Sequence, residues 1–433
     1  MTGQNNFIVL EKMEKRRSLK EIYYQKLCKS IRPVIIFSRI VGFLPRATPT
    51  SEKKKSGKLI LKMITTDWIY FTIYLTSYLL VLLYNLKILV NKEIVFYISK
   101  NLQIVFVSIS GLYTFGLITF AYKERDVLNA CLNCISEVDN LLEMIELEIC
   151  YGNLQKKILL NFFIISLLTA IRTLSFLLVR EIYFMQHICL FFTLILKLAF
   201  VSIFCIFADI LSYRFALIND TIKSYARHRN DIHTTSLYIE KLYILCRSHF
   251  KLCNVALKLT SSYGFQLLFM AIVMMLNFVS QFYLLYVFWN LNNASGGIVK
   301  LVAISFWFLT ETYEIYGLVL KCTQASGNAN EVPITLHELQ NEVDNYKIEE
   351  EIQKYSLKML HQRLGFSALE FFEFDFSLLF TMMGSILTFL VIVVQIEQGN
   401  MKDVAYTVTE LINSTLTTVM DDIVDGDYDD YDY

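Results

Sequence analysis

The chain of 433 residues is 55% hydrophobic, has a mean hydropathy of +0.45 and contains only four prolines. This composition is far too apolar for an ordinary soluble domain and predicts a polytopic membrane protein. Lys and Arg number 40, as do Asp and Glu, so the net charge is zero and gives no indication of nucleic-acid binding. Only the distribution of charge along the chain is informative.

The amino-terminal region, residues 1–64, is predicted to be a basic cytoplasmic segment. Met1–Lys62 holds 15 Lys or Arg against four Glu. No uninterrupted apolar core follows the first basic residues, so no signal peptide is expected. Pro33–Leu44 is too short to span a membrane and has Arg39 at its middle, which indicates an interfacial helix or a packed cytoplasmic piece.

Seven apolar stretches follow within residues 65–397, the predicted channel domain. Each is long enough for a helix to cross a hydrocarbon core of roughly 30 Å, and the sixth is the least apolar. The fold class predicted is therefore all-α, with seven transmembrane helices. The stretches lie near Trp68–Val90, Leu102–Tyr122, Ile158–Leu178, Phe191–Leu211, Tyr263–Trp289, Ile298–Leu320 and Phe376–Ile396.

Basic residues alternate strongly between the two sides of these spans. The non-membrane segments are counted from the amino terminus. The first, third, fifth and seventh of them together hold 32 Lys and Arg, and the alternate ones hold 5. The positive-inside rule therefore places the amino terminus in the cytoplasm and the carboxyl terminus outside. This orientation is opposite to that of a G-protein-coupled receptor, and the last span also lacks an Asn-Pro pair.

The third, fourth and sixth spans carry ionisable residues, which are expensive to bury without a partner. Arg172 and Lys197 fall in the outer third of their spans, and Glu311 and Glu314 lie near or below the middle of theirs. Snorkelling, an internal ion pair and the polar wall of a ligand cavity all fit these positions. Asp209 lies close enough to a membrane boundary for solvation to be expected.

The cytoplasmic segments are long and compatible with helices. A fourth helix that continues from Phe191 to about Tyr225 would be about 50 Å long and must project below the membrane. This length predicts a cytoplasmic helical bundle. Asp375, just before the last span, stands where an N-cap would satisfy open backbone donors.

The last span, Phe376–Ile396, has 21 residues and no charge. Its few polar residues recur at helical spacing within a face about 100° wide. Such a stripe either packs against neighbouring helices or lines water. The residues are Ser377, Thr381, Ser385, Thr388 and Gln395, together with Gly384.

Thr388–Ile396, TFLVIVVQI, resembles the T-Y-h-h-h-h-h-Q-F signature, with h apolar, that closes the seventh span of insect gustatory receptors. Phe389 replaces the usual Tyr and Ile396 the usual Phe. LSYRFALIN, residues 211–219, resembles the R-F-x-x-L/I-N element of the same family at the end of the fourth span. The chain also resembles the family's amino-terminal pattern, through Pro33, Arg39, Gly42 and Pro45.

The resemblance implies a taste receptor that works as a ligand-gated non-selective cation channel in the plasma membrane of chemosensory neurons. It implies a homo- or heterotetramer with other gustatory receptors, surrounded by membrane lipid and packed in part by a short helix at Leu364–Phe372. The last span would line the pore, through Ser377, Thr381, Ser385, Thr388, Ile392, Gln395 and Ile396. A small-molecule tastant would occupy a pocket open to the outside, for which the candidate residues are Arg172, Lys197, Phe282, Trp307 and Glu311.

Two other functions compete with this interpretation: a seven-span receptor that signals through a G protein, and a secondary transporter. The odd number of spans and the absence of an internal repeat argue against the transporter. Cys131 and Cys134 form a C-x-x-C without a second ligand pair, so neither a metal nor another cofactor is expected, and no motif supports an enzyme.

Two features are predicted on the outer side. Asn293 and Asn413 head N-x-S/T sequons and are candidate glycosylation sites. The tail, residues 398–433, has seven Asp in its last 13 residues. Such a tail is expected to be disordered and solvated.

Overall fold

A computed structural model of the chain describes residues 2–41, 65–91, 97–123, 125–178, 184–227, 235–290, 297–342 and 345–399. Within these ranges the backbone is almost entirely helical, and one isolated β-bridge joins Ser367 to Glu373. Asn293, Asn413 and the tail beyond Gly399 lie outside the described residues. Their glycosylation and disorder therefore stay predictions.

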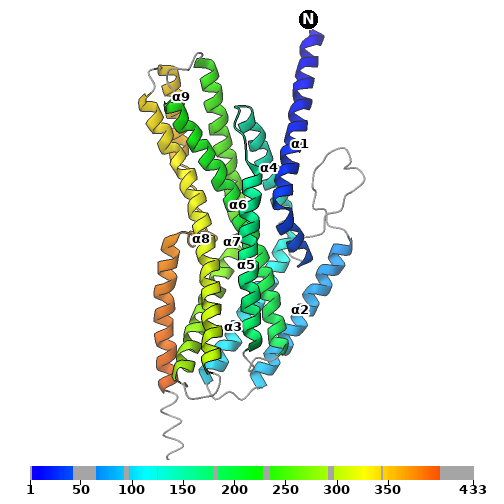
Figure 1. Cartoon of the computed structure of the whole chain (residues 1–433), viewed down its shortest axis with the longest axis vertical. Helices are drawn as coiled ribbons and strands as arrows, with labels where there is room; N and C mark the ends of the chain where they lie inside the picture. Colours follow the sequence, from blue (N-terminus) through cyan, green and yellow to red (C-terminus); the bar gives the residue numbers. More distant parts are fainter. Residues whose placement is uncertain are drawn as a thin grey trace, which may run out of the picture.

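All seven predicted spans are helical, and their helices lie beside one another in the lower half of the molecule (Figure 1). Length and hydropathy alone select four stretches in the described part of the chain, at 151–175, 191–225, 236–286 and 376–399. The first two spans contain shorter apolar helices, Leu75–Asn91 and Ile104–Phe120, and the sixth span is not selected. The helices are α2 Thr65–Asn91, α3 Tyr97–Lys123, α5 Tyr151–Leu178, α6 Phe184–Arg227, α7 Thr235–Asn290, α8 Gly297–Glu342 and the last helix Phe376–Gly399.

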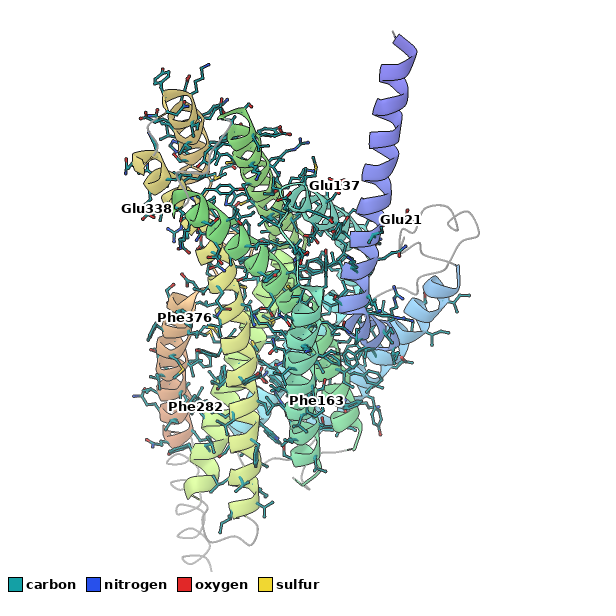
Figure 2. All side chains as sticks on the ribbon, turned by 45° about the horizontal axis from the view of Figure 1, so that its top comes forward. Glu21, Glu137, Phe163, Phe282, Glu338 and Phe376 are labelled. Atoms are coloured by element: carbon teal, nitrogen blue, oxygen red, sulfur yellow. The ribbon has the colours of Figure 1, made fainter. Side chains whose placement is uncertain are left out.

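The upper half of the molecule is formed by the extensions of α6, α7 and α8 together with α1 Thr2–Ile40, α4 Arg125–Glu143 and α9 Tyr346–Leu360. With 44 and 56 residues, α6 and α7 are about 66 and 84 Å long at 1.5 Å per residue, more than twice a hydrocarbon core. The predicted continuation of the fourth helix to about Tyr225 is thus confirmed. Figure 2 shows Glu21, Glu137 and Glu338 in this half and Phe163, Phe282 and Phe376 in the other.

The segment around Pro33 is a packed piece of the protein, as one of the two interpretations of its sequence required. It forms the end of α1, which contacts α4, α5 and α6. Ile31 and Val34 are buried in the main hydrophobic cluster. Pro33 lies inside the helix and has no backbone N–H, so the helical bond to the carbonyl of Lys29 is missing at this point.

A fully buried ion pair ties α4 to α6 in the upper half. Arg214 reaches Asp139 in bidentate geometry, with Nε to Oδ1 and Nη2 to Oδ2 both at 2.6 Å. Tyr151, the first residue of α5, donates its hydroxyl to the same carboxylate. Phe215 and Asn219 are buried beside it. The R-F-x-x-L/I-N element therefore forms a joint between three helices.

The short helix expected at Leu364–Phe372 is absent, because this segment folds as a tight loop. Ala368 N–H donates to Phe372 O at 2.9 Å, and Leu369 and Glu370 have positive φ. The side chain of Asn330 on α8 bonds both the N–H and the carbonyl of Leu364. These tertiary bonds replace the hydrogen bonds that a helix would supply.

The loop also rests against α7 at Gly264. A Cβ at this position would lie 3.1 Å from the backbone nitrogen of Leu369, closer than most side chains tolerate. The lack of a side chain at Gly264 therefore permits the backbones to approach.

The loop leads directly into the last helix, whose start is capped as predicted. Oδ1 of Asp375 accepts the backbone N–H of Ser377 at 3.0 Å and of Leu378 at 3.2 Å, and the Ser377 hydroxyl at 2.6 Å. The hydroxyl bond, assisted by the two backbone bonds, lowers the pKa of Asp375 below its ordinary value. The cap is therefore ionised at neutral pH.

The expectation that Asp209 is solvated is wrong. Its side chain is 3% exposed. It binds Lys321 of α8 at 2.7 Å and Lys157 of α5 at 3.1 Å. Two lysines from neighbouring helices replace the water that the boundary position suggested.

Candidate functional site

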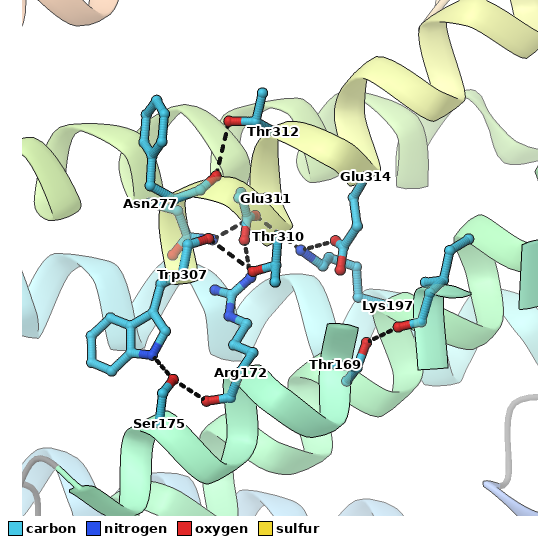
Figure 3. A network of polar contacts seen from close by, with 12 residues as sticks. Thr169, Arg172, Ser175, Lys197, Asn277, Trp307, Thr310, Glu311, Thr312 and Glu314 are labelled. Carbon is cyan, nitrogen blue, oxygen red and sulfur yellow. Dashed lines mark hydrogen bonds and ion pairs between the residues drawn. The ribbon is translucent and has the colours of Figure 1, made fainter. Parts of the chain in front are cut away.

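Four charged side chains meet between α5, α6 and α8 in the spanning half of the molecule (Figure 3). Lys197 Nζ lies 2.9 Å from Glu311 Oε1 and 2.6 Å from Glu314 Oε2. Arg172 Nη1 contacts the other oxygen of Glu311. Each of these side chains is at most 6% exposed. The structure thus shows an internal ion-pair network rather than snorkelling.

The network is electrically balanced. Two cations face two carboxylates, and Asn277 on α7 donates its Nδ2 to Glu311 Oε1 at 3.0 Å. Glu311 therefore receives bonds from three helices. Such pairing is what allows a carboxylate to remain ionised at this depth. The bonds to the buried carboxylate of Glu311 therefore link α8 to α5, α6 and α7.

A cavity of about 70 Å³ adjoins this network, lined by residues of α3, α5, α6, α7 and α8. Arg172, Lys197 and Trp307 form part of its wall. Glu311 lies behind the wall, bonded to the two cations. Phe282 is turned away from it and packs against Phe308, with ring centroids 5.1 Å apart. The structure thus brings three of the five predicted ligand residues onto one wall.

Sequence reasoning missed the uncharged polar residues of the wall. Asn277, Ser280 and Gln281 come from α7, Ser110 from α3 and Thr193 from α6. A signal was present, because 277, 280 and 281 stand at i, i+3 and i+4 within an apolar stretch and therefore share one helix face. Thr193 accepts a hydrogen bond from Thr114 at 2.9 Å, and Trp307 donates its indole N–H to Ser175.

The cavity is small in this state. A volume of 70 Å³ holds a few water molecules, whereas pockets for drug-sized ligands occupy about 300–1,000 Å³. A ligand larger than a few atoms must widen it. The helices that surround the cavity would have to move apart.

The last helix divides cleanly into a packed face and an exposed face. Its buried residues are Leu378, Met382, Ile386, Val393 and Glu397. Exposed on the other side are all seven predicted pore residues, Ser377, Thr381, Ser385, Thr388, Ile392, Gln395 and Ile396. With about 100° per residue, the centres of the two faces lie roughly 110° apart.

The hydroxyls of the exposed face bond to their own helix. Thr381, Ser385 and Thr388 each donate to the carbonyl four residues earlier, at 2.9–3.0 Å. The stripe thus leaves its outer surface available and makes no contact that holds it to the other helices of the same chain. In the described single chain the stripe is exposed, so both packing against a helix of a neighbouring subunit and contact with water stay as predictions for it.

The carboxyl-terminal end of the last helix is attached to α7. Gln398 Nε2 donates to the Tyr286 hydroxyl at 3.2 Å. The buried carboxyl of Glu397 lies beside Tyr283. Ser280 and Gln281, on the preceding turn of α7, line the cavity. One stretch of α7 therefore contacts both the cavity and the last helix.

Comparisons with known proteins agree with this architecture. The model of the 7tm chemosensory receptor family matches residues 31–400. A protein named gustatory receptor 28b, from Drosophila melanogaster, is 22% identical and aligns over 93% of this chain and 94% of its own length. Gustatory receptor for bitter taste 66a, from the same fly, is 27% identical over 39% of this chain and 32% of its own length.

Solved structures show the same fold. The insect olfactory receptor OR5 from Machilis hrabei superposes with a TM-score of 0.64 at 14% identity, and the match covers 86% of this chain and 99% of that one. Its complex with eugenol gives a TM-score of 0.65 at 15% identity.

Proposed function

Because this chain belongs to the 7tm chemosensory receptor family, we propose that it is a gustatory receptor that acts as a ligand-gated, non-selective cation channel. The family match confirms the resemblance seen in the sequence and the seven-span helical fold. A receptor of this family is a membrane protein with several spans. The channel mechanism, the pore and the ligand site are the proposal.

The observation that carries the channel is the outward-turned polar stripe on the last helix. The amide of Gln395 would be costly to expose to lipid, since hydrocarbon offers polar groups no partners, whereas the hydroxyls of the stripe already bond to their own helix. In a homo- or heterotetramer the stripe meets its copies around a central axis and lines water. Ile392 and Ile396, exposed on the same face, then close the pore by excluding water.

The cavity beside Arg172 and Lys197 is the proposed ligand site, and α7 connects it to the pore. A small-molecule tastant widens the cavity and displaces Ser280 and Gln281. Tyr286, just over one turn further along α7, holds Gln398 at the outer end of the last helix. Displacement of this stretch of α7 is therefore transmitted to the constriction near Ile396.

The charge bias of the sequence supports an orientation with a cytoplasmic amino terminus and an extracellular carboxyl terminus. In this orientation the upper half of the molecule, which contains α1, α4 and α9, is cytoplasmic, and the cavity lies toward the outside. Tastants would reach it from outside the plasma membrane of a chemosensory neuron.

Patch-clamp recording of cells that express the chain tests the proposal. We expect agonist-evoked cation current that persists when guanosine 5′-O-(2-thiodiphosphate) fills the cell and blocks G proteins. The current should also appear in excised outside-out patches. Loss of the current in both conditions would instead identify a receptor that signals through a G protein. Agonist uptake without unitary conductance would identify a transporter.

A further inference from the structure

The wall of the cavity contains polar atoms that no described residue satisfies. Ser110 Oγ, Arg172 Nε and Gln281 Oε1 are buried and have no hydrogen-bond partner in the described part of the chain. All three residues line the same cavity, although they come from α3, α5 and α7. Buried polar atoms are normally paired, so their convergence marks positions where water or a ligand binds.

The three atoms require both donors and acceptors from the occupant. Arg172 Nε–H can only donate, Gln281 Oε1 can only accept and the Ser110 hydroxyl can do either. A hydroxyl group on the ligand serves each of them. An amide of Gln281 turned the other way would still find a partner in a hydroxyl.

The charges around the cavity argue against an ionic occupant. Arg172 and Lys197 lie on the wall, but both are already bound to Glu311, and Lys197 also reaches Glu314. An anion would have to compete with these carboxylates for the two cations. A cation would meet Arg172 and Lys197 before either carboxylate, since Glu311 lies behind them.

We propose that the ligand is a small neutral molecule with at least one hydroxyl group, bound by Ser110, Arg172 and Gln281 with its apolar part against Trp307 and Leu284. This inference rests on the proposed function, since it assigns a ligand class to the same cavity. Trp307 and Leu284 both line the cavity. The indole N–H of Trp307 is already donated to Ser175, so its ring offers the ligand an apolar surface.

Matched sets of compounds that differ in one neutral, cationic or anionic substituent test the class. Tyrosol, tyramine and 4-hydroxyphenylacetate share one aromatic skeleton, and glucose, glucosamine and glucuronate share a pyranose ring. Each is applied to cells that express the full chain, and each is added to the purified receptor during thermal unfolding. We expect current and a raised unfolding temperature from a neutral member of at least one set, with no response to its charged counterparts.

Two glutamine variants of α7 provide the control. Gln281→Met removes the wall amide at nearly constant volume and should raise the half-maximal concentration of the neutral agonist by about three- to tenfold, as expected for one lost hydrogen bond. Gln266→Met removes another buried, unpartnered amide of the same helix, about 22 Å away at 1.5 Å per residue. It should leave the half-maximal concentration unchanged.

The outcomes separate the ligand class from the channel. If charged members act as well as neutral ones, or if Gln281→Met behaves like Gln266→Met, the class is wrong. If no neutral hydroxylated compound shifts the unfolding temperature or evokes current while Ile396→Ser conducts, the class is also wrong and the channel stands. If neutral compounds raise the unfolding temperature but no variant ever conducts, the class stands and the channel proposal fails.

Discussion

The ammonium of Lys197 lies 2.9 Å from Oε1 of Glu311, so that a charge on α6 is bound to a charge on α8 within the spanning half of the protein. The same ammonium reaches Glu314, one turn further along α8. Removal of Lys197 would leave Glu314 without its cation, whereas Glu311 would retain Arg172.

Lys197→Met should therefore destabilise the receptor. Loss of one member of a buried ion pair typically costs about 3–5 kcal/mol because the remaining charge is left buried. We expect a lower unfolding temperature and less receptor at the surface. Adding Glu314→Gln should restore most of both, because the double variant is again balanced. Surface biotinylation measures the effect, with Lys87→Met at an exposed position as the control; equal surface levels for Lys197→Met and Lys87→Met would contradict it.

Asp139→Asn should be at least as damaging in the upper half of the molecule. It leaves the fully buried Arg214 without its carboxylate and weakens the bond from Tyr151. We expect a loss of about 3–5 kcal/mol in the free energy of unfolding. Lys354→Met, which breaks an exposed pair with Glu351 at 3.4 Å, should cost less than about 1 kcal/mol. Denaturant unfolding of the purified receptor compares the two variants. Similar decreases in the free energy of unfolding would show that the buried pair stabilises the protein no more than the exposed pair does.

Ile392→Ser and Ile396→Ser should raise the current measured without ligand. A hydroxyl in the constriction admits water and lowers the barrier to ions. Leu387→Ser is the matched control, because Leu387 is also exposed but lies roughly 140° around the helix from Ile392. An equal rise for Leu387→Ser would show that the effect comes from a weakened helix rather than from the pore.

Gln395→Ala should change single-channel conductance or ion preference more than agonist sensitivity, since the amide is exposed at the outer end of the proposed pore. If the amide instead bonds a neighbouring subunit, its loss would cost about 1 kcal/mol and lower assembly. Unitary currents recorded beside surface biotinylation distinguish these two roles. Normal permeation with reduced surface protein would remove Gln395 from the pore.

An epitope placed after Tyr433 should stain intact cells, and one placed before Met1 should stain only permeabilised cells. The bias of 32 basic residues to 5 predicts this orientation. The reverse staining pattern would show that the receptor has the opposite orientation, with the proposed ligand site on the cytoplasmic side. Shifts in mobility after treatment with a glycosidase, compared with those of an Asn413→Gln variant, would report whether Asn413 is modified.

The features that depend on local pattern were predictable from the sequence. The spans follow from hydropathy, the cap at Asp375 from its position and the stripe of the last helix from its period. Each of these signals lies within about 25 residues of chain, so no knowledge of the fold was needed.

The features that depend on partners far along the chain were not predictable. Arg172 and Glu311 are 139 residues apart, and Asn330 meets Leu364 across 34 residues. The sequence identified the charged residues of the spans but not their pairing. Asp209 and the loop at 364–372 were misjudged for the same reason, since lysines and an asparagine from other helices decide their environment.

The position of the loop that leads into the last helix depends on the absence of a side chain at Gly264, because the backbone of Gly264 lies close to Leu369. An added methyl group would press on the backbone nitrogen of Leu369 as well as on its side chain, so the loop itself would have to shift by a few tenths of an ångström. Leu369 lies only seven positions before Phe376, and the shift would reach the start of the last helix. Gly264 in the fifth span thus helps to fix the position at which the seventh span begins.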